Sequence, residues 1–380
     1  KMPRIFLSSS VDGELIRYVE RCLHGAGETE RFVTVSESGY RAAANGGRLT
    51  RLGLRLRMYF WHPLRMVLRM LLTPKGSVWV VTTNPFFAPA IAAIVGKLRG
   101  QQVVHLLYDL FPDALEEAGL IARNGWIARC LGYFPKQALR HSSVTVFLGD
   151  SLKTHAEARW GAADQSCLIP VVLSQPLCEE PHPAEDGPVG IHYGGQLGWM
   201  HDAELLAKLV SGFQSRCAVA DPQRAHWFFN ISGAKAAWFR QTMMDTGVEL
   251  SGTLPVDEWR ERALSTEVGL VSLSEGGARV CLPSKTFGMM ACGMAILAVC
   301  PKDSDLAQVV ESSEAGWVVD TSVGNQAVLQ SNFNKTVASI LDHPEERTRR
   351  RENALKHVAE ENRKDLIENR WHSLFKSPKY

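Results

Sequence analysis

The 380-residue sequence lacks the usual signatures of metal-binding and disulfide-bonded proteins. None of its eight cysteines forms a C-x-x-C pair, and several lie in apolar runs. A metal site and a disulfide framework are both unexpected, and we interpret the cysteines as small buried residues in a reducing compartment. The cysteines stand at positions 22, 130, 167, 178, 217, 281, 292 and 300.

Long hydrophobic runs are also missing. No stretch of about 18 apolar residues is free of charge, so no membrane-spanning helix is expected. The first ten residues do not form a charged region followed by a long apolar one, so no N-terminal signal is predicted and the chain is expected to be cytoplasmic. A net charge of +2 argues against a general nucleic-acid binder. The length favours two domains, or three, with an ample core.

Acidic residues are absent from residues 38–108, a span that carries ten lysines and arginines. Leucines and arginines recur there at helical spacing, and Pro63 is expected to separate this helix from a second one at 64–72. Basic and apolar faces together are typical of a helix at a membrane surface. A core helix with arginines at its rim is the alternative, but the acid-free run is longer than one helix needs. The recurring residues are Leu49, Leu52, Leu56, Arg48, Arg51 and Arg55.

The first half alternates short apolar strands with helices, which predicts a doubly wound α/β domain. The chain opens with a strand at 4–9, a polar loop that includes Asp12 and Gly13, and a helix to about His24. A G-x-G-x-x-G fingerprint is absent. A helix is expected around 126–141. Further strands are predicted at 32–35, 77–83, 102–108, 143–148 and 168–173.

Asp109 follows the strand at 102–108 directly. Open α/β sheets place their ligands at the carboxyl ends of their strands, so a carboxylate there is a functional candidate. A loop or N-cap role is the alternative.

The stretch 175–188 is rich in proline and acid and is the predicted linker. The second half restarts with a strand at 189–193, followed by a glycine loop. A cleft between two such halves is the default ligand site. Further strands are predicted at 226–231, 248–250, 268–273, 295–299 and 316–320, with a charged helix at 345–364.

Residues 274–301 contain an irregular run with paired glycines and then Pro283-Ser284-Lys285, where a helix is predicted to begin. Gly293 is expected to end it in a left-handed conformation. A glycine-rich loop before a helix can hold an anion. Lys285 is at the unfavourable end of the helix dipole, which a bound phosphate would explain. Plain packing of loop, helix and strand remains the alternative.

Several motifs occur in the order found in one enzyme family. They are Gly194-Gly195-Gln196-Leu197-Gly198, Ser232-Gly233, Ser251-Gly252-Thr253-Leu254-Pro255, and Pro283-Ser284-Lys285 through Ala291-Cys292-Gly293. In the first half, Tyr108 to Asp113 resembles the DLWPES-like segment of bacterial members that build surface polysaccharides. Nearly the whole chain thus resembles GT-B glycosyltransferases, family 4 in particular.

The resemblance implies an α/β fold of two Rossmann-like domains facing across a cleft. The expected parts are an acceptor domain at 1–175, a linker at 176–188, a nucleotide-sugar domain at 189–355, and a C-terminal helix at 356–380 that crosses back. The family uses no cofactor or metal and retains the anomeric configuration. Its nucleoside-diphosphate sugar is a co-substrate, here expected to be a UDP-sugar, and its acceptor is often lipid-linked.

The resemblance also assigns roles to residues. Asp109, Glu275 and Lys285 are the expected catalytic residues, while Asp12, Gly13 and Asp113 are expected on the acceptor side. The expected donor-binding residues are Gly194, Gly195, Gly198, Ser232, Gly233, Leu254, Arg279, Ser284 and Lys285.

The sequence departs from the family at four places. The spacing from Glu275, the expected sugar-facing carboxylate, to Gly288 is longer than usual. Gly288 stands where members usually have the glutamate that binds the ribose. Trp199 to Asp202 occupies the stretch that often carries Arg or Lys, with Arg279 as a possible substitute. Ile169-Pro170 resembles the start of an Ile-Pro-Asn segment of the family, and Val171 stands where that segment has its asparagine.

The leading hypothesis is a retaining glycosyltransferase that works on a glycan acceptor at the inner membrane face. The basic helices would dock there on anionic lipid. The alternatives are a catalytically degenerate relative that acts as a binding or scaffold subunit, and a sugar-nucleotide epimerase of the same fold.

Overall fold

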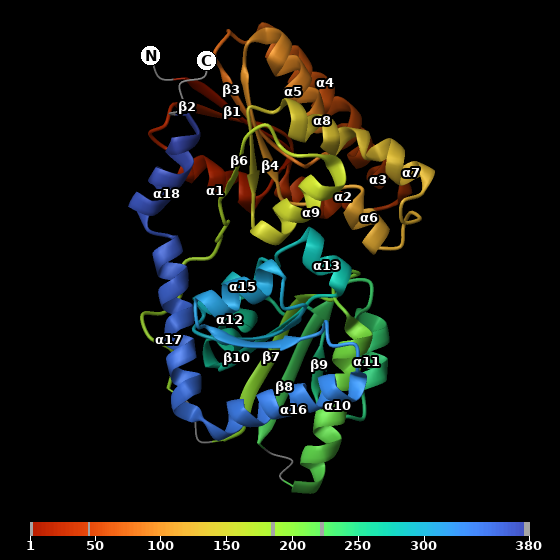
Figure 1. Cartoon of the computed structure of the whole chain (residues 1–380), viewed down its shortest axis with the longest axis vertical. Coiled ribbons are helices and arrows are strands. Elements are labelled where there is room, and N and C mark those ends of the chain that lie inside the picture. The colour runs from red at the N-terminus through yellow and green to blue at the C-terminus, as the bar shows by residue number, and fades with distance from the viewer. Residues whose placement is uncertain (1–2, 45, 184–186, 221–223, 376–380) are drawn as a thin grey trace. The chain divides into compact units, whose positions relative to one another are not determined.

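The computed structural model describes residues 3–44, 46–183, 187–220 and 224–375. They form two compact units of parallel sheet and helices (Figure 1), which confirms the prediction of two Rossmann-like α/β domains. One unit contains the chain up to Leu173 together with the segment from Lys364, and the other runs from Ser174 to Arg363. Residues 184–186 of the predicted linker and 376–380 of the predicted C-terminal helix lie outside the described residues.

Six parallel strands form the sheet of the N-terminal unit, in the order β2-β1-β3-β4-β5-β6. All of β3 and most of β4 is buried, as expected for strands covered by helices on both faces. Because β1 lies between β2 and β3, the strand order reverses there, and the ligand crevice of such a sheet is expected at the carboxyl ends of β1 and β3. The strands are β1 Arg4–Asp12, β2 Glu28–Ser36, β3 Val78–Thr82, β4 Gln102–Leu107, β5 Val144–Phe147 and β6 Ser166–Leu168.

Helices cover this sheet, and α18, from the end of the chain, completes its core. Trp371 of α18 is buried in one cluster with Ile5, Leu7 and Val19. The helices are α1 Glu14–Cys22, α2 Glu37–Ala44, α3 Arg48–Leu56, the π-helical turn η1 Arg57–Trp61, α4 His62–Leu72, α5 Ala88–Arg99, α6 Asp113–Glu117, α7 Trp126–Leu131, α8 Tyr133–His141, α9 Asp150–Trp160, α18 Lys364–His372 and the 3-10 turn η2 Ser373–Phe375.

The C-terminal unit has a second parallel sheet, in the order β12-β11-β10-β7-β8-β9. Its order reverses between β7 and β10, so the expected ligand crevice lies at their carboxyl ends. The strands are β7 Val189–Gln196, β8 Ala225–Ser232, β9 Glu249–Ser251, β10 Val268–Ser272, β11 Ala295–Cys300 and β12 Gly316–Asp320. The helices are α10 Ala203–Ala220, α11 Ala236–Met243, α12 Val256–Ser265, α13 Glu275–Val280, α14 Lys285–Ala291, α15 Asp305–Ser312, α16 Gln326–Asp342 and α17 Pro344–Glu361.

The helix over residues 48–72 continues through Pro63, so the predicted break there is wrong. Pro63 lies in the first turn of α4, directly after the π-helical turn η1. A π turn moves the hydrogen-bonded carbonyl one residue further back, which relieves the clash that proline causes inside an α-helix. Buried side chains recur along the helix at Leu54, Met58, His62, Met66 and Met70.

The predicted helix around 126–141 is divided at Gly132 into α7 and α8. The indole of Trp160 lies against Gly132, so that a Cβ there would come within 2.0 Å of the ring. Only glycine tolerates this approach.

The paired glycines after Ser274 form a helix, α13, where the sequence predicts an irregular run. The Ser274 hydroxyl accepts a hydrogen bond from the Gly277 N–H at 3.0 Å and caps the helix. A Cβ at Gly277 would lie 2.2 Å from the Met200 carbonyl oxygen, so glycine permits close backbone packing. Gly293 follows α14 with a φ of +75°, as predicted.

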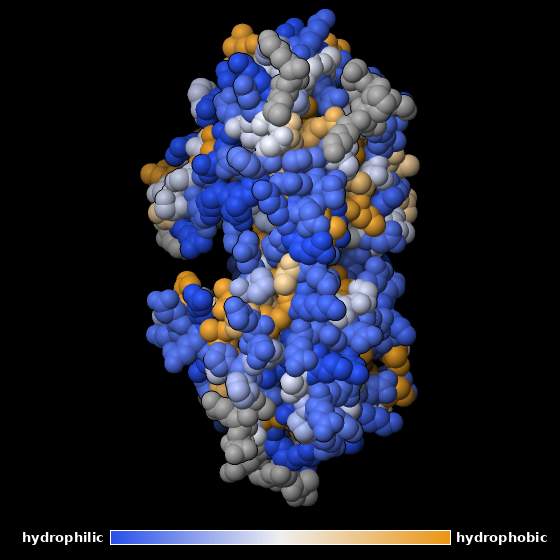
Figure 2. All heavy atoms as spheres, turned by 90° about the vertical axis from the view of Figure 1, so that its left-hand side faces the viewer, coloured by the Kyte–Doolittle hydropathy of each residue, from blue (hydrophilic) through white to orange (hydrophobic). Residues whose placement is uncertain are grey.

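The C-terminal unit extends to Arg363, beyond the predicted end at 355, because α17 is unbroken to Glu361. In each unit the face seen in Figure 2, which carries α17 in the C-terminal unit and α18 in the N-terminal unit, is mostly hydrophilic. Within the described ranges, no helix combines the length and the apolar character needed to cross a bilayer.

Candidate functional site

The glycine loop, Gly194 to Gly198, begins within β7, whose last residue is Gln196, and it is fastened to the loop after β8. Gly195 has a φ of +105° and Gly233 a φ of +99°, conformations that favour glycine. The Leu197 N–H donates to the Ser232 carbonyl at 2.7 Å, and the Lys235 N–H donates to the Leu197 carbonyl at 3.1 Å. The backbone at this edge is therefore held in place before any ligand binds.

Residues that follow the glycine loop are hydrogen-bonded to the end of β10 and to the residues after it, where the ligand crevice of this sheet is expected. The Ser274 N–H and hydroxyl both donate to the Met200 carbonyl, at 2.9 and 3.2 Å. His201 Nδ1 lies 2.6 Å from the Ser272 carbonyl and must carry the proton of that hydrogen bond. Burial, with the charge of Lys285 nearby, lowers the pKa of His201 to about 3. A neutral imidazole therefore presents Nε2 as an acceptor.

Lys285 begins α14 with a buried ammonium group. Its Nζ has no hydrogen-bond partner within the described part of the chain, and it lies 3.7 Å from the centroid of the Tyr193 ring. Burial lowers the pKa of Lys285 to about 7. A cation–π contact stabilises a desolvated ammonium only partly. An anionic ligand would complete this site by restoring the charge of Lys285.

Three other predicted residues lie nearer the surface. Glu275 and Arg279 are exposed and form an ion pair with each other, one turn apart on α13. Ser284 is exposed just before Lys285. A Cβ at Gly198 would meet no atom within 4 Å, so the backbone there borders open space. A ligand could reach the Gly198 backbone without displacing a side chain.

Leu254 faces a separate cavity of about 550 Å³. Gly190 and Phe228, from the first halves of β7 and β8, line the same cavity, whereas Lys285 and His201 do not appear among its described lining residues. Leu254 and Lys285 therefore do not line this cavity together within the described residues. Gly288 is half-buried, and a Cβ there would make only an ordinary contact with Ser174 Oγ at 3.6 Å. Packing therefore does not require glycine at this position.

The sequence did not single out Tyr193, His201 or Lys235. Lys235 Nζ lies 5.3 Å from the centroid of the Trp199 ring and 3.6 Å from Glu204 Oε1. The sequence could have indicated Lys235 through its position two residues after Gly233, because the loops that follow neighbouring parallel strands meet at the carboxyl edge of the sheet.

Asp109 lies in the N-terminal unit, exposed at the carboxyl end of β4. Its N–H lies 3.5 Å from Thr83 Oγ1, in the loop after β3. The Ser10 hydroxyl donates to Asn84 Oδ1 at 2.9 Å and ties β1 to that same loop. The loop and strand ends of β1, β3 and β4 therefore meet at the edge where this sheet is expected to bind a ligand.

Asp12 and Gly13 are at the end of β1. The Asp12 carboxylate pairs with Arg31 Nη1 at 3.1 Å, and Gly13 is the N-cap residue of α1. A Cβ at Gly13 would meet no atom within 4 Å, so a ligand could approach the backbone there.

Asp113 is buried, and its carboxylate is already engaged. It accepts hydrogen bonds from His155 Nε2 at 2.7 Å, Arg159 Nη1 at 2.7 Å and Trp160 Nε1 at 2.8 Å. Burial alone would raise the pKa of Asp113, but these three donors lower it. Asp113 therefore anchors α6 to α9 behind the Asp109 loop instead of lying open to an acceptor.

We expect Asp113→Ala to lower the free energy of unfolding by about 2 kcal/mol, because it leaves the half-buried side chains of His155, Arg159 and Trp160 without the carboxylate that they contact. Urea denaturation would measure the loss, with exposed Asp164→Asn as the control. Since the folded-state pKa is lowered, this stabilisation is present above the unfolded pKa of about 4 and is lost as the pH falls through the folded value. A variant as stable as the parent would contradict the anchoring role.

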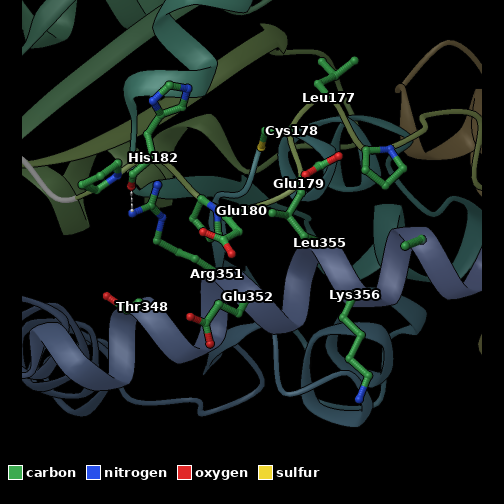
Figure 3. A pocket seen from close by; sticks show the side chains of 14 residues that line it. Leu177, Cys178, Glu179, Glu180, His182, Thr348, Arg351, Glu352, Leu355 and Lys356 are labelled. Carbon is green, nitrogen blue, oxygen red and sulfur yellow. Dashed lines mark hydrogen bonds between the residues drawn. The ribbon is translucent and has the colours of Figure 1, made fainter.

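A larger cavity of about 790 Å³ lies between residues 176–183 and α17 (Figure 3). Arg351 donates to the His182 carbonyl and to the Gly293 carbonyl, both at 2.8 Å, and so fastens this segment to the unit. The carboxylates of Glu179, Glu180 and Glu352 line the cavity and would repel a diphosphate. This cavity is therefore not the candidate donor site.

No family model matches the chain. The chain is 24% identical over 258 residues to the protein named "Probable glycosyltransferase WbjE" of Pseudomonas aeruginosa. That similarity covers 64% of this chain and 62% of the relative, less than two thirds of the relative's length.

The crystal structure of Anabaena Alr3699/HepE in complex with UDP superimposes with a TM-score of 0.67 at 12% identity, over 98% of this chain and 99% of that one. This chain has the GT-B fold of glycosyltransferases. Sucrose-phosphate synthase from Thermosynechococcus elongatus gives a TM-score of 0.65 at 16% identity, over 99% of this chain and 98% of that one. At these identities the likeness shows the GT-B architecture alone.

Proposed function

We propose that this chain is a retaining glycosyltransferase that moves a sugar from a UDP-sugar to a glycan acceptor, lipid-linked, in polysaccharide biosynthesis. The buried, unpartnered ammonium of Lys285 is the observation that carries the proposal, because it needs an anion where the GT-B fold is expected to bind one. The structures of Alr3699/HepE were solved with UDP and with UDP-glucose, which supports the choice of nucleotide.

The donor diphosphate would lie over the glycine loop, where Gly195 and Gly198 leave the backbone accessible. During transfer, the bond between the anomeric carbon and the diphosphate breaks and negative charge grows on the leaving oxygen. Lys285 and fixed backbone N–H groups would stabilise that charge, so the proposal needs no metal.

Asp109 would face the acceptor hydroxyl from the N-terminal unit. The hydroxyl oxygen forms the new bond to the anomeric carbon and gives up its proton, either to the departing phosphate oxygen or to the carboxylate. Before transfer Asp109 orients the hydroxyl by accepting its hydrogen bond, and where the phosphate oxygen takes the proton, that hydrogen bond is exchanged for one to the phosphate as the reaction proceeds.

Thermal unfolding with nucleotides tests the donor class. We expect UDP and UDP-sugars, without added metal, to raise the melting temperature by several degrees, because a ligand at 100 times its dissociation constant stabilises by about 2.7 kcal/mol. GDP, ADP and dTDP are the controls. No shift from any nucleotide would overturn the proposal.

The helix over 48–72 is proposed to bind an anionic membrane surface at the cytoplasmic face. Leu49 is 85% exposed, Phe60 66% and Leu72 82%, although they stand in a helix that buries only one narrow stripe. Arginines 48, 51 and 55 are exposed along the same helix. Exposed apolar groups combined with basic ones are the pattern of a helix that lies in the membrane interface.

Replacing Arg48, Arg51 and Arg55 by Glu should release the protein from anionic liposomes. Each lysine or arginine near such a surface contributes about 1 kcal/mol, so we expect at least a tenfold loss of partitioning in flotation. The matched control changes the charge equally on the C-terminal unit, at the exposed residues Lys335, Arg349 and Lys356. Equal flotation of the two triple variants would refute docking through this helix.

A binding or scaffold subunit that has lost catalysis is the second candidate. Gly288 favours it, because the structure gives no packing reason for glycine at a position where the family has a ribose-binding glutamate. UDP binding without any transfer or hydrolysis of the donor sugar would support this alternative.

A further inference from the structure

A row of aromatic rings joins η1 to the Asp109 loop within the N-terminal unit. The ring centroids of Tyr59 and Phe87 lie 6.3 Å apart, those of Phe87 and Phe86 5.2 Å, and those of Phe86 and Phe111 5.5 Å. Phe134 lies beside this path, 5.6 Å from Phe87 and 5.8 Å from Phe86. These rings come from four separate segments of the chain.

The row lies at the surface. Phe86, Phe87, Phe111 and Phe134 are each half-buried, and none of them belongs to the described hydrophobic core clusters of this unit. Tyr133, 55% exposed, adds a ring 5.9 Å from Phe134. Packing of the core therefore does not account for the row, and a contiguous, partly exposed apolar strip is typical of an interaction site.

The two ends of the row lie at two different parts of the proposed enzyme. Tyr59 belongs to the amphipathic helix, next to the exposed Phe60 and Trp61. Phe111 follows Asp109 by two residues, at the carboxyl edge of the sheet. An apolar path therefore leads from the proposed membrane surface to the proposed acceptor carboxylate.

We propose that this row binds the hydrocarbon chain of a phosphate-bearing lipid acceptor and guides its sugar end to Asp109. This inference rests on the proposed function. The rings offer apolar faces to a chain, and the helix over 48–72, which carries Tyr59, has six arginines and no acidic residue, which suits an anionic lipid phosphate. A peptide partner would not require the basic residues beside the row. A soluble glycan would not require a row of apolar rings that leads from η1 to the Asp109 loop.

Photolabelling with farnesyl phosphate that carries a benzophenone group tests the proposal on the whole protein. We expect cross-links in the peptides that contain residues 84–87, 111–112 and 133–135. Unlabelled farnesyl phosphate should compete, whereas inorganic phosphate and maltotriose should not. Labelling confined to 48–72 would overturn the proposal in favour of membrane contact alone. Competition by maltotriose would overturn it in favour of a sugar site.

Variants then test the rings directly. Tyr133→Ala combined with Phe134→Ala should weaken farnesyl phosphate binding at least tenfold, while Leu98→Ala, at the exposed far end of α5, should not. UDP-induced thermal stabilisation reports on the other unit and should be the same in all variants. If UDP stabilises the parent but the row is never labelled, this inference fails alone. If UDP has no effect, the proposed function fails, while labelling of the row would still show lipid binding.

Discussion

Replacing Lys285 by methionine should weaken UDP binding by roughly 10- to 100-fold. A hydrogen bond between a charged group and its partner contributes about 1.5–3 kcal/mol, and the buried ammonium of Lys285 lacks a hydrogen-bond partner in the described structure. Methionine keeps an unbranched apolar stem against the Tyr193 ring, so the change removes the charge with little loss of packing. Isothermal titration with UDP measures the effect, and Lys335→Met on the exposed face of α16 is the control.

The same titration has a second readout. The pKa of Lys285 is about 7, so at pH 8 most molecules carry a neutral amine, and a bound diphosphate should raise that pKa and draw in a proton. Titrations at pH 8 in two buffers of different ionisation enthalpy should show proton uptake in the parent and none in the variant. His201 should contribute little at this pH, since its pKa is about 3. Equal uptake by parent and variant would remove Lys285 from the phosphate site.

Without ligand, Lys285 should make stability depend on pH. Its folded pKa of about 7 is below the unfolded value of about 10.4, so between these values the unfolded state binds more protons. Stability should therefore rise with pH across this window, and Lys285→Met should lose that rise. Urea midpoints from pH 7 to 10 measure it, and parallel curves for the two proteins would contradict a buried ammonium.

Asp109→Asn should lower the rate of sugar transfer by 100-fold or more and leave the dissociation constant of UDP unchanged. A positioned carboxylate that accepts the proton of a reacting hydroxyl contributes about 10²- to 10⁴-fold, and an amide accepts it poorly. UDP binding should not change, because Asp109 belongs to the N-terminal unit and the proposed donor residues belong to the other. Transfer assays with UDP-sugar and a lipid-linked acceptor would measure the rate.

Asp164→Asn is the matched control for this change. Asp164 is also exposed in the N-terminal unit, but it precedes β6, at the opposite edge of the sheet. Full transfer activity of Asp109→Asn would exclude Asp109 from the reaction. A weaker UDP affinity would place its role in donor binding instead.

The sequence by itself predicted the strands in their order of appearance, except that the strand predicted at 168–173 is wrong: β6 ends at Leu168, just before Pro170, which cannot donate to a strand ladder. Continuous apolar runs such as 295–299 predict strands covered on both faces, and β11 is buried along its whole length. It also placed Asp109 at the carboxyl end of β4, which ends at Leu107, because the end of an apolar run is a local feature. The left-handed Gly293 was predictable for the same reason, since a helix end and the strand after it lie within a few residues.

Only the tertiary structure decided how distant residues meet. Lys285 lies on the Tyr193 ring, and His201 donates to the Ser272 carbonyl 71 residues further along the chain. Gly132 accommodates Trp160, and Gly277 accommodates the backbone of Met200. None of these contacts follows from local periodicity, because each depends on which strands become neighbours in the sheet and on the close packing of side chains around them. The sheet order brings the glycine loop beside the end of β10, and that neighbourhood places an unpaired ammonium at the site where a diphosphate is proposed to bind.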